Sequence, residues 1–429
     1  MDNASSFTMT LFRKARHYAR KLWVRVVLIG LLAVLAVALS QWVELYVPDT
    51  LSRSLDGAAA DRLLQLIASA MLAVTIFSIT VMVSVYQSSS TQWTPRVHRL
   101  IMQDKTTQNT LAVFIGAYVY ALLGIILREL GVYDDDRAFV LFWMTVFVLA
   151  VIVVYLIRWV LHLQDFGQLT KTTRQVEAVT RARFKERLET PCLGAMPLVG
   201  DVPEGAKPVK AWDSGYIQCI YPEAMNALAK ECDVTLYLVR DIGSYVFSGD
   251  PLLCVEGAEK IRNWDAFSAR LGEMLVLSDL RSYDQDPRFG LLVLGEIGSK
   301  ALSPGINDPG TAIEVITRIG RILTGYEDEN YATPATPLEH LHVAPLDPVD
   351  LLRDGFATLA RDGAEVVEVQ QALQQTLAHL VGHDDPKLSA AACDFAQESL
   401  ARALNACGFD PDRDRITASA HPEVRGDNK

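Results

Sequence analysis

Motifs of known enzymes and metal sites are missing from this chain of 429 residues. It has no Walker A loop, no G-x-S-x-G elbow, no H-E-x-x-H pair and no dinucleotide-binding glycine pattern. It also lacks a C-x-x-C pair, so a zinc knuckle is not indicated. We therefore expect a protein that is not an enzyme and that carries no cofactor and no metal.

Charged residues are few in four long apolar stretches of the first 165 residues. These stretches are roughly Leu22–Val43, Leu63–Val85, Leu111–Leu127 and Phe139–Leu161. Each approaches or exceeds the ~17–25 residues that a helix needs to cross a ~30 Å hydrocarbon core. None alternates polar and apolar residues as a strand does. The sequence predicts a four-helix transmembrane domain over residues 22–165.

The charge between these stretches changes sign at every link. Residues 13–25, 96–105 and 158–187 are rich in Lys and Arg, whereas the links at 44–61 and 129–136 are acidic. Basic segments remain in the cytoplasm. We expect a multi-pass protein of the bacterial inner (plasma) membrane with both termini in the cytoplasm.

The N-terminal arm has more than one interpretation. Residues 1–21 form a basic cytoplasmic arm, and Leu11–Trp23 mixes basic and apolar residues at helical spacing. This segment either lies on the anionic inner leaflet or is solvated and only sets orientation. A cleaved signal peptide ending near Ala36-Val37-Ala38 is the alternative for the first stretch, although the apolar run exceeds a normal signal core.

The rest of the chain is acidic and holds all of the cysteines. The net charge is −11 in spite of the basic membrane flanks, which argues against a nucleic-acid partner. The six cysteines follow the fourth stretch, in what we expect to be a reducing compartment, so we expect free thiols. They are Cys192, Cys219, Cys232, Cys254, Cys393 and Cys407.

We expect the remainder of the chain to form a cytoplasmic α+β region with several segments of different composition. We expect a helical extension at 166–190, a Pro/Gly-rich linker at 191–211, a small β-rich module at 212–257, a mostly helical domain at 258–408 and a disordered tail at 409–429. The fold class is thus a membrane α-helical bundle, followed by a small β-rich module and a helical C-terminal domain.

Local patterns predict individual elements of this region. Gly215–Ile220 and Val234–Val239 read as strands, with a short helix from Pro222 between them. Ser248–Pro251 reads as a tight turn between two further strands. Four Asp-Pro pairs each precede a helical pattern, because Asp caps the first free amides and Pro fits the first helical position. The helices so predicted are Pro287–Leu302, Pro309–Leu323, Pro348–Leu359 and Pro386–Cys407, with another at Ala364–Val381.

Two neighbouring segments are dense in turn and capping residues. Residues 281–291 read RSYDQDPRFGL, and residues 301–312 read ALSPGINDPGTA. In the second segment Pro304 stops one helix, Gly305 supplies a permissive backbone, and Asp308 starts the next helix. Helix starts favour anions.

These segments resemble the signature of the DUF2254 family, bacterial membrane proteins of unknown function. The resemblance covers four spans, a β-containing module, the R…QDP-FGL stretch and the ALSPGINDP loop. The segment SSSTQWTPR at residues 88–96 also fits the family pattern. Gly298 and Gly310 stand where we expect bulkier residues. The resemblance implies the architecture and assigns no activity.

Candidate site residues fall in three places. A tight structural corner is the favoured interpretation of the 303–311 loop, and a small ligand or anion bound at the start of the second helix is the alternative; the ligand residues would be Arg281, Ser303, Asn307, Asp308 and Thr311. His379 and His383, or His340 and His342, have spacings that metal sites use, but a histidine pair at a helix end is the simpler interpretation. The second stretch carries small hydroxyl residues that indicate a pore or a helix-packing face: Ser69, Thr80, Ser84 and Ser88.

Two functions are compatible with these features. The first is an oligomeric channel or transporter with a cytoplasmic regulatory domain, because four spans enclose little of a path alone. The second is a membrane-anchored sensor or scaffold whose cytoplasmic domain binds a ligand or a protein. The partners expected are the lipid bilayer and further copies of the chain.

Overall fold

A computed structural model gives the fold of the chain in two compact units, Met1–Lys171 and Thr172–Lys429. The residues that it describes are 57–92, 94–97, 104–130, 138–165, 168–329 and 337–426, with single positions at 24, 26, 27 and 31.

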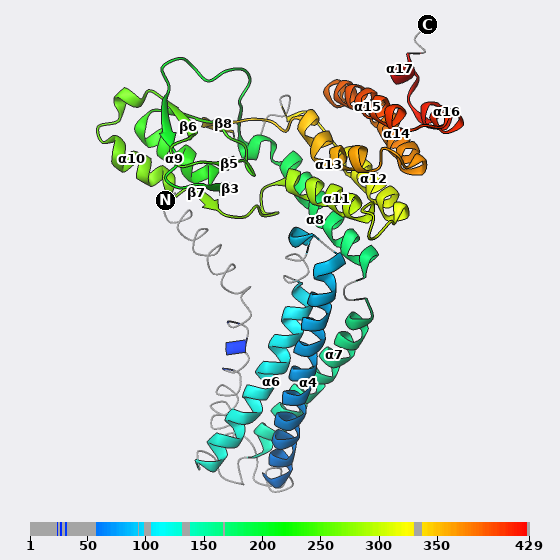
Figure 1. Cartoon of the computed structure of the whole chain (residues 1–429). Helices are drawn as coiled ribbons and strands as arrows, with labels where there is room; N and C mark the ends of the chain where they lie inside the picture. Colours follow the sequence, from blue (N-terminus) through cyan, green and yellow to red (C-terminus); the bar gives the residue numbers. More distant parts are fainter. Residues whose placement is uncertain are drawn as a thin grey trace. The chain divides into compact units, whose positions relative to one another are not determined.

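The described part of the first unit consists of three long helices (Figure 1). They are α4 (Gly57–Gln92), α6 (Lys105–Glu129) and α7 (Ala138–Asp165). Each contains a segment long and apolar enough to cross a membrane: Ala59–Gln87, Thr106–Glu129 and Leu141–Gln164. The predicted first span, Leu22–Val43, and the basic arm lie outside the described residues apart from the four single positions. A fourth transmembrane helix is therefore not confirmed.

Helix α6 is the central helix of this bundle. Half of its apolar window is buried, against 22% for α4 and 17% for α7. Gly124 of α6 lies against Leu64 of α4, where an added Cβ would be 3.1 Å from the leucine methyl Cδ1, so the two helices approach closely at this point. Arg128 of α6 forms an ion pair with Asp61 of α4 at 2.9 Å, and His162 of α7 lies 3.1 Å from the carboxylate of Asp104, the N-cap of α6.

The predicted hydroxyl face of α4 does not pack against α6 or α7. Ser69, Thr80 and Ser84 are exposed, and the side chain of Ser88 lies outside the described residues. The hydroxyls of Ser69 and Thr80 donate to carbonyl oxygens one turn earlier, so their hydrogen bonds are satisfied within the helix. The buried face of α4 consists of other residues, four of them apolar and two with hydroxyl groups: Ala60, Leu64, Ile67, Met71, Thr75 and Ser78. Among the described helices, α6 and α7 thus do not cover Ser69, Thr80 and Ser84.

The second unit begins with α8 (Leu169–Glu189), which occupies the predicted helical extension. Two sheets follow in the chain. The first has the order β1-β8-β4-β6-β2, and the second has the order β5-β3-β7. The strands are β1 (Ala195–Pro197), β2 (Lys207–Lys210), β3 (Gly215–Ile220), β4 (Thr235–Leu238), β5 (Tyr245–Val246), β6 (Pro251–Glu256), β7 (Leu275–Ser278) and β8 (Leu338–Val343).

These sheets correct two predicted boundaries. Residues 191–211 are not a linker, because the 3₁₀ helix η2 (Pro191–Gly194), β1 and β2 lie there and both strands join the larger sheet. The β-rich module also extends beyond residue 257, since β7 and β8 come from the region predicted to be mostly helical. Strand β8 pairs in parallel with β1 and β4, so a segment far along the chain completes the sheet.

The predicted turn at Ser248–Pro251 joins two sheets rather than two paired strands. The amide of Asp250 donates to Phe247 O at 3.0 Å, and Gly249 has a φ of +95°, which favours glycine. Strand β5 before the turn belongs to the small sheet, and β6 after it belongs to the large one. Two helices and the 3₁₀ helix η3 (Ala258–Lys260) complete the module: α9 (Pro222–Cys232) and α10 (Trp264–Gly272).

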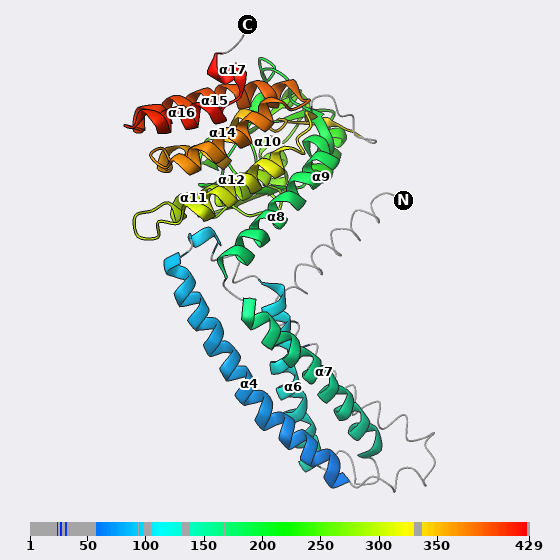
Figure 2. The same ribbon diagram turned by 90° about the vertical axis from the view of Figure 1, so that its right-hand side faces the viewer.

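Five helices form a packed array after the sheets (Figure 2). They are α11 (Pro287–Ala301), α12 (Pro309–Leu323), α13 (Pro348–Asp362), α14 (Val367–Val381) and α15 (Pro386–Ala406). All four predicted Asp-Pro starts are confirmed, because each aspartate accepts a hydrogen bond from an amide in the first turn. Gly298 of α11 lies against Leu359 of α13, which leaves no room for the bulkier residue expected there.

Two more helices replace the predicted disordered tail. They are α16 (Asp410–Ser419) and α17 (Pro422–Arg425), and both pack against α15. Ile416 is buried in a cluster with Leu400 and Ala403, so apolar burial orders a segment whose composition is mostly polar.

Candidate functional site

Arg281 does not lie with the other predicted ligand residues. Its guanidinium donates to the carboxylate of Asp286 at 2.8 and 3.0 Å, at the start of α11. The other four residues follow the end of this 15-residue helix, about 22 Å away along its axis. Gly243, with a φ of +88°, lies directly against this pair, and a side chain there would collide with Asp286. Arg281 therefore holds the junction between the sheets and α11.

The 303–311 loop is capped by its own side chains. Ser303 Oγ donates to Lys300 O at 2.7 Å, while the carboxylate of Asp308 accepts from Thr311 N at 3.1 Å and from Thr311 Oγ1 at 2.5 Å. The Thr311 hydroxyl and amide lower the pKa of Asp308, so the helix start already holds a negative charge. A second anion would be repelled there. This geometry favours the structural corner, which is also the interpretation that the sequence favours.

The left-handed residue of this loop is Asn307 rather than Gly305. Asn307 has a φ of +50°, and its amide donates to Ser303 O at 2.9 Å. Gly305 has nothing within 4 Å of the position of an added Cβ and does not have a positive φ. Asparagine tolerates the left-handed region better than most residues.

The stretch at 281–291 is also a junction. The side chain of Gln285 bonds both backbone groups of Ile220 in β3, at 2.9 and 3.1 Å. Gly290 lies against Thr180 of α8, where a side chain would collide. The segments that resemble the family signature thus connect β3, α8 and α11, and they build the second unit rather than a pocket.

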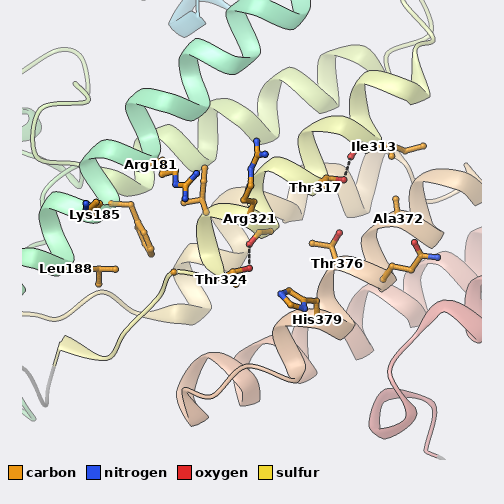
Figure 3. Close-up of a pocket in the computed structure, with 15 residues that line it drawn as sticks. Arg181, Lys185, Leu188, Ile313, Thr317, Arg321, Thr324, Ala372, Thr376 and His379 are labelled. Carbon is orange, nitrogen blue, oxygen red and sulfur yellow. Dashed lines mark hydrogen bonds between the residues drawn. The ribbon is translucent and has the colours of Figure 1, made fainter.

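An open cavity of about 880 Å³ lies elsewhere in this unit, between α8, α12 and α14 (Figure 3). Arg181 and Lys185 come from α8, Arg321 from α12 and His379 from α14. None of the described residues that line the cavity is acidic. The lining therefore carries positive charge at three side chains, or four when His379 is protonated.

Apolar and hydroxyl side chains complete the wall. Phe184, Leu188 and Ile313 supply apolar surface. The hydroxyls of Thr317 and Thr324 donate to backbone carbonyls at 3.0 and 2.9 Å, which leaves their oxygen lone pairs as acceptors (Figure 3). The wall therefore combines an apolar surface with a cationic rim, and it fits a ligand that is partly apolar and negatively charged.

The cationic groups differ in how they are held. Arg321 is 55% exposed and donates a hydrogen bond through one guanidinium nitrogen to Glu177 of α8. The Glu177 carboxylate is buried, and Arg318 also contacts it. Lys185 lies 3.4 Å from the exposed Glu189, a pair of little energetic weight. Arg181 makes no ion pair among the described residues. Arg321 is the one member of this set that connects the cavity to a buried charge on α8.

Sequence reasoning missed this cavity because its residues come from separated segments. Arg181 and Lys185 served only as basic residues that indicate the orientation in the membrane. Arg321 was not among the candidate site residues. A detectable signal was the spacing of α8, where Arg181 and Lys185 lie four residues apart, next to Phe184 and Leu188 with the same spacing.

The histidine pairs do not form metal sites. His379 lies in the last turn of α14, whereas His383 lies beyond that helix, accepts from Asp385 N at 3.0 Å and contacts Thr324 O at 3.1 Å. His340 contacts Val234 O, and His342 stacks on Tyr237. Over the described ranges, no group of three or more His, Cys, Asp and Glu residues is placed to hold a metal ion.

Comparison with known proteins agrees with this architecture. The model of a family described as "Predicted membrane protein (DUF2254)" matches residues 19–379. Two relatives are the uncharacterized proteins Mb1321c of Mycobacterium bovis and Rv1290c of Mycobacterium tuberculosis. Each is 28% identical over 262 residues, which cover 58% of this chain and 48% of the relative. The chain thus spans about half the length of the curated relatives it matches. No solved structure matches. The chain belongs to the DUF2254 family of predicted membrane proteins.

Proposed function

We propose that this protein is a membrane-anchored receptor for a small, partly apolar anion, which binds in the cavity between α8, α12 and α14. The observation that carries the proposal is the lining: Arg181, Lys185 and Arg321 line an open cavity with no acidic residue among its described lining. The volume of about 880 Å³ lies within the range of small-molecule sites.

The chemistry of the lining selects the ligand class. Guanidinium groups bind phosphate and carboxylate through paired hydrogen bonds, and desolvation beside Phe184 and Ile313 strengthens such bonds. An aryl or acyl phosphate or carboxylate satisfies both surfaces. A bare inorganic ion would leave the apolar wall uncovered.

Helix α8 supports a receptor role because it is the chain's own continuation of the last membrane helix. α7 ends at Asp165, and α8 begins at Leu169. An anion that binds Arg321 competes with Glu177 of α8 for the same guanidinium. Ligand occupancy would thereby weaken one of the contacts that hold α8 to α12.

We also propose the bacterial inner membrane as the location, with both termini in the cytoplasm. The support is the basic character of residues 13–25, 96–105 and 158–187. A reporter enzyme that works only in the periplasm, fused after Lys429, should stay inactive. Activity of that fusion would contradict the orientation.

Equilibrium dialysis of the detergent-purified chain with 1-naphthyl phosphate tests the receptor proposal. 1-Naphthol is the neutral control with the same rings, and equal micelle concentrations on both sides cancel partitioning. We expect the phosphate to bind to wild type and Arg321→Gln to weaken it about tenfold, as expected for a lost charged hydrogen bond. The matched control is Arg402→Gln, an exposed arginine on α15 that pairs with Glu398. Equal binding of both probes, or equal loss in both variants, would contradict the proposal.

An oligomeric channel remains the second candidate. Ser69, Thr80 and Ser84 lie on the exposed face of α4, so a polar path along them would form between copies of the chain and not among α4, α6 and α7. Mass measurement in detergent checks this first, and a monomer would exclude such a path. Solute flux in liposomes that Ser84→Leu abolishes would favour the channel.

A further inference from the structure

A second cavity, of about 480 Å³, lies on the β-rich part of the second unit, away from α8, α12 and α14. Its lining contains two indole rings, Trp212 and Trp264, and three charged side chains, Lys210, Asp265 and Glu273. Trp212 is 51% exposed, which is high for the largest apolar side chain. The receptor proposal does not use this cavity.

The two indoles are held in place by α10. Trp264 is the first residue of α10, next to the N-cap Asn263, whose side chain accepts from Ala266 N at 3.1 Å. Trp212 lies over Gly272 at the other end of the same helix, where an added Cβ would be 3.3 Å from the ring. Because this position is a glycine, the ring can approach the helix closely, while half of the Trp212 surface stays exposed.

The charges at this cavity favour a cation. Asp265 and Glu273 are exposed, and neither makes an ion pair within the part of the chain that the structure describes. Lys210 is the one lysine or arginine among the described lining residues, so the lining holds two carboxylates against one ammonium group; Lys207, which is not in the lining, brings a second ammonium group to the ring of Trp264.

The ring of Trp264 already contacts an ammonium group. Lys207 Nζ lies 4.0 Å from its centroid, within the range of a cation–π interaction. A tryptophan face attracts cations electrostatically, and quaternary ammonium groups are bound by aromatic side chains in this way.

We infer that the cleft between Trp212 and Trp264 binds a compact organic ammonium ion, with the indoles contacting its methyl groups and Asp265 and Glu273 balancing its charge. This is the opposite charge preference from the α8–α12–α14 cavity. The two sites are therefore tested with different probes, and either can fail alone.

Saturation-transfer NMR on the full chain in deuterated detergent tests the inference, with choline as the probe. Its neutral carbon analogue, 3,3-dimethylbutan-1-ol, is the matched control. We expect saturation of the choline methyl signal and at least tenfold weaker binding of the alcohol. Trp212→Leu and Trp264→Leu should each abolish the choline signal.

Charge variants keep the test decisive if a tryptophan variant fails to fold. The double variant Asp265→Asn, Glu273→Gln changes only exposed side chains and should weaken choline binding about tenfold. Lys207→Met removes a competing ammonium and should strengthen binding severalfold, while Glu259→Gln, an exposed carboxylate outside the cleft, should leave it unchanged. Equal binding of choline and its neutral analogue, preference for a neutral sugar such as methyl glucoside, or absence of choline binding would each overturn the inference.

Discussion

At the scale of single residues, the ALSPGINDP loop depends on one unusual backbone position. Asn307 has a φ of +50°, which costs a β-branched residue about 1–2 kcal/mol or more. We expect Asn307→Val to lower the unfolding free energy by about that amount and Asn307→Gly to leave it unchanged or raise it. Urea unfolding of the detergent-purified chain measures both. A valine variant as stable as wild type would show that the loop adopts another conformation.

Asp308 adds a pH-dependent contribution at the same corner. Removing the cap with Asp308→Ala should cost about 1 kcal/mol. Hydrogen bonds from Thr311 lower the pKa of Asp308 in the folded chain, so its stabilisation is present above the unfolded pKa of about 3.9 and is lost as pH falls through the folded value.

Asp308→Asn keeps a capping group but does not titrate, so it isolates this effect. The difference in stability between wild type and this variant should be constant from about pH 5 to 8 and should shrink below about pH 4. A difference that grows on acidification would contradict the assignment.

A buried ion pair and two backbone amides hold the carboxylate of Glu329 in the second unit. The carboxylate of Glu329 accepts from the Arg187 guanidinium at 2.5 and 3.1 Å, from Cys192 N at 3.0 Å and from Leu346 N at 2.6 Å. Glu329→Ala should destabilise the chain by about 3–5 kcal/mol, because it leaves a buried charge unpaired. Glu327→Ala, at a neighbouring exposed position, is the control, and similar unfolding midpoints for both would contradict this role.

At the scale of elements, α11 and α13 approach closely through facing glycines. A Cβ on Gly295 would lie 2.6 Å from Gly355 O, a backbone atom that cannot rotate away. We expect Gly295→Ala to destabilise the chain by about 1–3 kcal/mol through overpacking. Gly408→Ala, which has open space around it, should have little effect on the same unfolding curve.

Elements with local signals were predictable, whereas pairings across long distances were not. The helix starting at Pro309 was predicted to end at Leu323 and does so, because an Asp-Pro start and an apolar period lie within the segment itself. Strand β8 carried no such signal, since its place depends on β1 and β4 more than a hundred residues earlier. The spacing on α8 was the one local signal of the cavity, and its other walls could not be predicted because α8, α12 and α14 meet only through tertiary packing.

At the scale of the whole molecule, Glu177 of α8 is proposed to compete with an anion in the cavity for the guanidinium of Arg321. Glu177→Gln removes the charge that competes for Arg321, so 1-naphthyl phosphate should bind severalfold more tightly. Arg318 keeps Glu314 as a partner in this variant. Dialysis against the same probe measures the change, and unchanged or weaker binding would argue against competition for Arg321.

Hydrogen–deuterium exchange of α8 tests the account most directly. The purified chain would be compared with and without saturating 1-naphthyl phosphate, with 1-naphthol as the neutral control. The receptor proposal predicts that the phosphate alters exchange in peptides covering residues 177–188, and that Arg321→Gln removes the change. Phosphate binding that leaves these peptides unaltered, or identical effects of the phosphate and the neutral alcohol, would contradict it.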